Sequence, residues 1–226
     1  MVDKQAVQRG YDELAEQYDG WRERGGRGVD LLDDVLGALS PDARLLDAGC
    51  GGGQPVLARA SETTDAVGLD FSGEQLRLAG EHAPTADRVQ GDMTALPFAA
   101  DSFDAVVAYW SVIHVPLADH QTVVDEFARV LRPGGRLLLC EGTTEWVGEN
   151  PDWFDSGTGM AWEIAGAEAT DRQLLSAGFA VTDRWGLPES LSDDADAVGE
   201  NDDADAANEA ESSDDPWTFF AARLPE

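Results

Sequence analysis

The chain has 226 residues with a hydrophobic content of 42%, enough for one α/β domain with a full core and short for two. Its formal net charge of −30 comes from 45 acidic and 15 basic residues, of which Lys4 is the single lysine. Since dense salt screens self-repulsion, this dispersed acid excess favours a halophilic surface over one that binds a basic partner. The chain shows no basic stripe for nucleic acid, no membrane-length apolar run and no signal-peptide pattern, so we expect a cytoplasmic protein without nucleic-acid or membrane partners.

The first forty residues predict a helical lead-in. Apolar residues recur at three- and four-residue spacing over residues 5–24, and a second helix over 29–39 is stopped by Ser40 and the proline after it. We expect residues 1–40 to form a lid over a domain of residues 41–226.

A regular alternation of strands and helices follows. The predicted strands are 44–48, 65–70, 86–90, 103–109 and 135–140, and the helices between them are about 53–61, 72–83 and 118–131. Ser72 and Gln75 form a capping-box start for the second of these helices, and LRPGGR ends the third. Such an alternation indicates an α/β fold with a doubly wound, Rossmann-like, mainly parallel sheet.

The pattern changes after the fifth predicted strand. Residues 141–165 are rich in Gly, Trp and acids, and 170–177 predict a helix. Apolar runs at 179–186 and 216–223 predict an antiparallel hairpin at the sheet edge. Residues 191–215, between those two runs, contain no basic residue. We expect them to form a disordered acidic loop, because so polar a segment buries too little surface to offset its ordering entropy.

The first strand ends in the glycine-rich turn LLDAGCGGGQ. A dinucleotide-binding G-x-G-x-x-G motif fits at Gly49 and Gly51 but fails at Gln54, whereas D-x-G-x-G-x-G fits throughout from Asp47 to Gly53. The Asp47 carboxylate suits an ammonium group, and the backbone N–H groups with the following helix N-terminus suit a carboxylate. An amino-acid moiety carries both groups, so the pattern favours S-adenosyl-L-methionine over NAD(P).

Acids also end the next two strands. Asp70 ends the second, where an acid can accept hydrogen bonds from both hydroxyls of a ribose. Asp92 follows the third, where it can accept from an adenine amino group while the Met93 backbone donates to the ring and Phe71 stacks on it. The structural alternatives are a helix cap for Asp70, a loop cap for Asp92 and a core position for Phe71.

Five segments in order, LLDAGCGGGQ, GLDFS, GDMTALPF, FDAVVAYWSVIHV and LRPGGRLLL, resemble the motifs of class I S-adenosylmethionine-dependent methyltransferases. The match is closest to the small-molecule branch described as type 11 or type 25. The N-terminal segment YDELAEQYDGW also resembles the lead-in of that branch. The resemblance covers roughly residues 7–141. It implies a seven-stranded sheet of order 3-2-1-4-5-7-6 with strand 7 antiparallel. In that order strand four separates Cys50 from Cys140 by about 10 Å, so both are expected as free thiols.

The motifs and the resemblance together give a set of candidate cofactor contacts: Tyr11, Tyr18, Asp47, Gly49, Gly51, Asp70, Phe71, Asp92, Met93 and Tyr109. In the resemblance, the glycine turn and Asp47 hold the methionine end, Asp70 the ribose, and Asp92 with Met93 the adenine. Tyr109 approaches the transferable methyl group, while Tyr11 and Tyr18 close over the cofactor from the N-terminal helix. No metal site is expected.

The reaction itself asks little of the protein. The leaving group of a sulfonium is a neutral thioether, so a base is needed only where the acceptor keeps its proton. His114 after strand four and Glu141 after strand five are the candidates, with a packed or helix-capping histidine as the structural alternative. Residues 141–165 are expected to form the acceptor pocket through Trp146, Trp153, Met160 and Trp162, the alternative being a cover for the sheet edge.

The favoured function is in-line methyl transfer from S-adenosyl-L-methionine to a small organic acceptor, aromatic or quinone-like. One alternative is a non-catalytic cofactor-binding module, since the chemistry requires no catalytic residue. The other is an NAD(P)-dependent oxidoreductase, which Asp47 and Gln54 disfavour. We expect a monomer or a homodimer.

Overall fold

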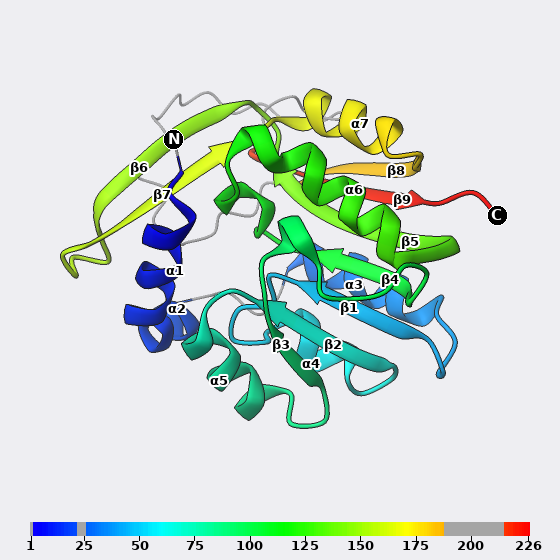
Figure 1. Cartoon of the computed structure of the whole chain (residues 1–226), viewed down its shortest axis with the longest axis horizontal. Coiled ribbons are helices and arrows are strands. Elements are labelled where there is room, and N and C mark those ends of the chain that lie inside the picture. Colours follow the sequence, from blue (N-terminus) through cyan, green and yellow to red (C-terminus); the bar gives the residue numbers. More distant parts are fainter. Residues whose placement is uncertain (1, 22–25, 188–214) are drawn as a thin grey trace, which may run out of the picture.

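The computed structural model describes residues 2–21, 26–187 and 215–226. Its centre is a seven-stranded sheet of order β3-β2-β1-β4-β5-β9-β8 (Figure 1). The strands are β1 (Arg44–Ala48), β2 (Asp65–Asp70), β3 (Asp87–Gln90), β4 (Phe103–Ala108), β5 (Leu131–Gly142), β8 (Ala180–Leu187) and β9 (Trp217–Arg223). With β8 and β9 as its sixth and seventh strands, this sheet confirms the predicted order.

The strand directions also agree with the prediction. Strands β1 to β5 pair in parallel, and β9 runs antiparallel to both β5 and β8. The parallel strands are continuous apolar runs because helices cover both faces of the sheet. In β1, Leu45 contributes to the core on one face and its neighbour Leu46 to the core on the other. Side chains alternate across a strand, so both faces need apolar residues.

The helices form layers around this sheet. They are α1 (Lys4–Glu13), α2 (Ala15–Trp21), α3 (Arg27–Gly37), α4 (Val56–Ala60), α5 (Gly73–His82), α6 (His120–Val130) and α7 (Ala167–Ser176). Phe127 of α6 and Leu174 of α7 belong to one core cluster, and Leu32 of α3 and Leu57 of α4 to the other. Helices α1 and α2 lie at the edge where β1, β2 and β4 end (Figure 1).

Most predicted helix bounds shift by up to three residues, and local backbone geometry accounts for two of the differences. The lead-in is broken into α1 and α2 at Leu14, whose φ of −110° leaves the helical region. Helix α4 begins at Val56 and not at residue 53, because Gly53 has a φ of +86° and Pro55 occupies the cap position. Ser72 caps α5 as predicted, its side chain accepting from the Gln75 N–H.

A second, two-stranded sheet was not predicted. It is the antiparallel hairpin of β6 (Trp146–Trp153) and β7 (Thr158–Ile164). Helix α1 packs closely against β7, because a Cβ atom at Gly10 would lie 3.0 Å from the Met160 Cε atom. The hairpin and the N-terminal helices therefore meet above the same edge of the main sheet (Figure 1).

Three remaining expectations concern segments around this fold. Cys50 and Cys140 are buried free thiols, as predicted. Within the described residues, none of the helices has the length and apolar character that crossing a membrane requires. The expected acidic loop 191–215 lies outside the described residues apart from Asp215.

Candidate functional site

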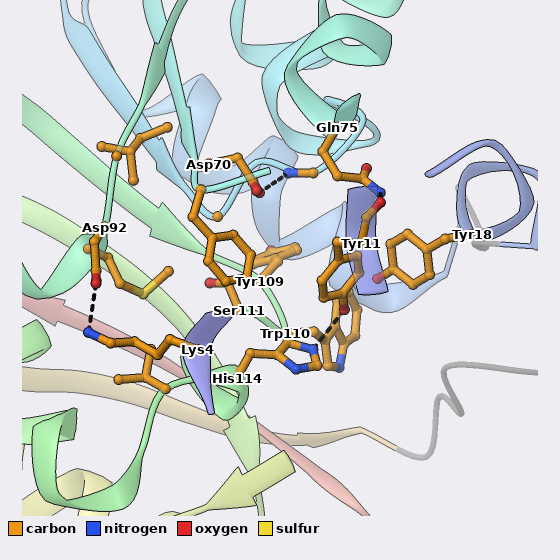
Figure 2. A pocket seen from close by; sticks show the side chains of 17 residues that line it. Lys4, Tyr11, Tyr18, Asp70, Gln75, Asp92, Tyr109, Trp110, Ser111 and His114 are labelled. Carbon is orange, nitrogen blue, oxygen red and sulfur yellow. Dashed lines mark hydrogen bonds and ion pairs between the residues drawn. The ribbon is translucent and has the colours of Figure 1, made fainter. Parts of the chain in front are cut away.

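A pocket with an empty volume of about 600 Å³ opens where the parallel strands end, beneath α1 (Figure 2). It is lined by Lys4, Tyr11, Tyr18, Gly49, Gly51, Leu69, Asp70, Phe71, Gln75, Gly91, Asp92, Met93, Tyr109, Trp110, Ser111, His114 and Val115. These residues come from the N-terminal helices and from the segments that follow β1, β2, β3 and β4. The carboxyl edge of an open parallel sheet is the usual ligand site of such folds.

The glycine turn forms one wall of this pocket. Gly49 has a φ of +79°, and a Cβ atom there would lie 2.3 Å from the Ser111 Cβ atom. Its N–H donates to the Leu69 carbonyl over 2.7 Å, which ties the turn to the end of β2. Only glycine meets both the left-handed backbone and the close approach, so the turn presents bare backbone to the pocket.

The Asp70 carboxylate stands beside this turn. Its Oδ2 atom accepts from the Gly51 N–H and its Oδ1 atom from the Ser72 N–H, both over 2.9 Å. Burial raises the pKa of Asp70 to about 6, against the opposing effect of these backbone donors. Each oxygen keeps a further lone pair, so the carboxylate can still accept a hydrogen bond from a ligand.

Asp92 lies at the opposite end of the pocket and is paired with Lys4 (Figure 2). Its Oδ2 atom lies 2.6 Å from the Lys4 Nζ atom, and its Oδ1 atom accepts from the Thr94 N–H over 2.9 Å. Partial burial raises the pKa of Asp92, but the hydrogen bonds from Lys4 and Thr94 outweigh it and hold the pKa below its ordinary value. Asp92 is thus both the loop cap and a pocket residue.

Aromatic side chains close the pocket around His114. The Tyr11 hydroxyl oxygen lies 2.7 Å from His114 Nε2, and Nδ1 lies 3.3 Å from the Ala161 carbonyl oxygen (Figure 2). A carbonyl only accepts, so it keeps the ring proton on Nδ1, and Nε2 accepts from the Tyr11 hydroxyl. Tyr18 packs edge-on against Tyr11, with ring centroids 5.1 Å apart.

Comparison with known proteins places the chain in a family. A family model described as a methyltransferase domain matches residues 46–139. An uncharacterised methyltransferase of Synechocystis is 33% identical over 149 residues, which make up 64% of this chain and 70% of that protein. The chain belongs to the class I S-adenosylmethionine-dependent methyltransferase family.

Two further likenesses extend the comparison. A demethylmenaquinone methyltransferase of Renibacterium salmoninarum is 35% identical over 139 residues, 58% of this chain and 56% of that protein. The chain thus spans about half the length of the first curated relatives it matches. The 1,6-didemethyltoxoflavin-N1-methyltransferase of Burkholderia thailandensis has a TM-score of 0.70 at 16% identity, over 98% of this chain and 88% of that one. At that identity the likeness shows the fold alone.

The residues that line the pocket fit the family's nucleoside cofactor. A Cβ atom at Gly49 would collide with Ser111, so only glycine brings the backbone of the turn this close to the pocket wall. The Gln75 Oε1 atom is buried in the pocket wall, and no donor reaches it within the described part of the chain. Bare backbone, acids and an unmatched acceptor suit a ligand rich in hydrogen-bond donors.

The pocket brings together most of the predicted cofactor residues but not Asp47. Asp47 is 2% exposed within β1 and is not among the lining residues. Tyr109 lines the pocket, and its hydroxyl donates to the Gly28 carbonyl over 2.7 Å. The predicted approach of Tyr109 to the methyl group and the role of Asp47 stay predictions.

Glu141 is not brought to the pocket. Its side chain is 1% exposed, and its Oε1 atom accepts from the Ala165 N–H over 3.0 Å. Burial raises the pKa of Glu141 to about 8. The carboxyl group thus ties the end of β5 to the segment after β7, and of the two predicted bases only His114 faces the pocket.

The large apolar side chains of the predicted acceptor segment are divided between surface and core. Trp146 is 50% exposed, whereas Met160 is 2% exposed. Trp153 packs against Tyr11, with ring centroids 5.6 Å apart, and Trp162 lies 6.0 Å from the His114 ring. These side chains support the residues that line the pocket and are not themselves part of its lining.

Sequence reasoning missed several residues that line the pocket: Lys4, Gln75, Trp110 and Ser111. Trp110 and Ser111 follow Tyr109 directly and could have been found as neighbours of a predicted site residue. Lys4 reaches Asp92 across 88 positions of sequence, and no local pattern indicates such a contact. Gln75 was assigned only to the capping box, which concealed its place in the pocket wall.

Proposed function

We propose that this protein transfers a methyl group from S-adenosyl-L-methionine to a small, apolar organic acceptor of aromatic or quinone-like character. The observation that carries the proposal is the single pocket in which the glycine turn, Asp70 and Asp92 face an aromatic end that holds His114. Family membership supports the reaction class. The name of the relative from Renibacterium salmoninarum, a demethylmenaquinone methyltransferase, supports the acceptor class.

In this proposal different residues of the chain bind different parts of the cofactor. Asp70 holds the ribose hydroxyls, Asp92 and Met93 hold the adenine, and the glycine turn with Asp47 holds the methionine end. When bound, the cofactor supplies a methyl group made electrophilic by its sulfonium. The protein's contribution is to hold the acceptor atom in line with that methyl group and to exclude water.

The N-terminal helices act as the lid of this site. The Gln8 Nε2 atom donates to the Phe71 carbonyl over 2.6 Å, and the Ser72 hydroxyl donates to Asp12 Oδ1 over 2.6 Å. These bonds fasten α1 to the end of β2, while the Tyr11–His114 bond fastens it to the segment after β4. Closure from both sides would shield the reacting groups from solvent.

The acceptor would lie against Trp110 and Val115, next to His114. An apolar acceptor suits this end because it adds no charge to a strongly acidic protein. Where the acceptor carries a proton that must leave, His114 Nε2 is the candidate base, because Nδ1 is held protonated by the Ala161 carbonyl. The proton would pass through the Tyr11 hydroxyl, which takes it up and gives its own proton to Nε2. Glu141 is left out of this role, since it lies outside the pocket.

Calorimetry with S-adenosylhomocysteine in molar KCl tests cofactor binding. Micromolar binding is expected, and absence of heat from a folded sample refutes the proposal. A screen of quinol, phenol and other small acceptors with labelled cofactor, read by mass spectrometry, then tests transfer. Cofactor binding without methylated product from any acceptor would favour the non-catalytic module, and saturable NADH binding would revive the oxidoreductase.

A further inference from the structure

Gln75 carries a buried acceptor without a protein partner. It lies in the first turn of α5, is 1% exposed and lines the pocket (Figure 2). Its Nε2 atom lies 3.5 Å from the Tyr11 carbonyl oxygen, while no donor reaches its Oε1 atom within the described part of the chain. Because that carbonyl can only accept, it fixes the orientation of the amide, with nitrogen towards Tyr11 and oxygen away from it.

The capping box does not account for this side chain. In a complete box the third helical residue reaches back to the N–H of the capping residue. Here Ser72 caps the Gln75 N–H over 3.1 Å, but its own N–H donates to Asp70 Oδ1 over 2.9 Å. Asp70 has taken the reciprocal bond. The Gln75 amide therefore makes no bond to the helix end. Gln75 and Asp70 lie on the two sides of the β2–α5 connection, and both line the same pocket.

We propose that Gln75 is a further cofactor-binding residue, whose Oε1 atom accepts a hydrogen bond from a ribose hydroxyl of the nucleoside. The inference rests on the proposed function and adds a second acceptor to the one that Asp70 provides. A ribose offers two adjacent hydroxyl donors. Asp70 already accepts two backbone N–H groups, so an extra acceptor at the same β2–α5 connection lets each hydroxyl bond to a different side chain. Ser72 sets the spacing, since it binds both residues.

This role makes opposite predictions for the free and the bound protein. Without ligand, an unmatched buried carbonyl weakens folding, so an apolar replacement stabilises the protein. With ligand, the same replacement leaves a buried hydroxyl unmatched and lowers affinity by about 10- to 100-fold. A glutamine with a purely structural role would lose stability on replacement and leave the affinity for the nucleoside nearly unchanged.

The test substitutes Gln75→Met, which keeps the length of the side chain, with Gln75→Leu as a second variant. Thermal unfolding of the ligand-free proteins in molar KCl is expected to show a higher Tm than the parent. Calorimetry with S-adenosylhomocysteine is expected to show affinity reduced by about 10- to 100-fold. The matched control is Gln121→Met on α6, whose amide donates to Asp125 and to the Gln173 carbonyl away from the pocket. It should leave that affinity unchanged.

A second ligand identifies the group that Gln75 binds. 5′-Methylthioadenosine carries the ribose but no amino-acid end, and its affinity can be measured by displacement of S-adenosylhomocysteine. Equal losses for both ligands support a ribose contact, whereas a loss confined to S-adenosylhomocysteine overturns it in favour of the ammonium. Unchanged affinity in both variants also overturns it. If the parent protein itself fails to bind S-adenosylhomocysteine, the proposed function fails with it.

Discussion

Glu141→Gln should remove a strong pH dependence from the stability of the protein. The carboxyl group of Glu141 is 1% exposed at the end of β5, and burial raises its pKa from the ordinary 4.5 to about 8. The Ala165 N–H donates to Oε1 over 3.0 Å, a bond that the carbonyl oxygen of glutamine can accept as well. The substitution thus mimics the protonated carboxyl group in shape and in this hydrogen bond.

The sign and the size of this pH dependence follow from the difference between the pKa of Glu141 in the folded protein and its pKa in the unfolded chain. Between pH 4.5 and 8 the folded protein keeps a proton that the unfolded chain has released, so the free energy of unfolding falls as pH rises. A difference of about 3.5 pH units corresponds to about 5 kcal/mol at full development. The parent and the variant should therefore be nearly equal in stability at pH 5. By pH 8 the variant should be more stable by several kcal/mol.

Urea unfolding in molar KCl at intervals from pH 5 to pH 9 measures this difference. Glu149→Gln is the matched control, because Glu149 is exposed on β6 and the same chemical change should leave its pH profile parallel to that of the parent. A difference between parent and Glu141→Gln that stays constant with pH, or a parent that is the more stable at pH 8, would show that Glu141 is ionised in the folded protein. Either result refutes the reasoning.

Three further predictions concern the pocket and the surface. Burial raises the pKa of Asp70 to about 6, and the carboxylate form is the stronger acceptor for ribose. S-adenosylhomocysteine should therefore bind about 10-fold more weakly at pH 5 than at pH 7. In Asp70→Asn this pH dependence should vanish from calorimetric titrations. Gly49→Ala should destabilise the protein by at least about 1–3 kcal/mol in urea unfolding, because Gly49 has a φ of +79° and an added Cβ atom would collide with Ser111. Gly37→Ala on α3 is the control: its added Cβ atom would meet no other atom within 4 Å, so it should be neutral or stabilising. With a net charge of −30, dilution from molar KCl to millimolar salt should unfold the protein, as followed by circular dichroism; retention of the fold would instead favour a basic partner for the acidic surface.

Local patterns in the sequence predicted the sheet and much of the pocket. The run of Leu45 and Leu46 indicates a strand buried on both faces, and the glycines that follow force a turn, so the strand end and its acids could be located from the chain alone. Ser72 indicated the start of α5. These signals act over a few residues, because backbone sterics and side-chain alternation are local properties.

The β6–β7 hairpin shows where such signals end. The β6 segment mixes Gly, Pro and acids among its tryptophans, so period-two alternation is weak. The strand forms because it pairs with β7, which in turn packs against α1. Propensity along the chain carries no information about such neighbours.

By itself, the sequence determined the alternation of β1 to β5 with helices, the parallel sheet and the acids at the ends of β2 and β3. Only the tertiary structure decided that Lys4 pairs with Asp92, that Tyr11 binds His114 and that Glu141 lies outside the pocket lining. It also decided that no donor reaches Gln75 Oε1 within the described part of the chain. The physical reason is that hydrogen bonding in a buried site is a competition among groups distant in sequence. Asp70 takes the bond that the capping box reserves for Gln75, and only the folded arrangement shows which acceptor is then left over.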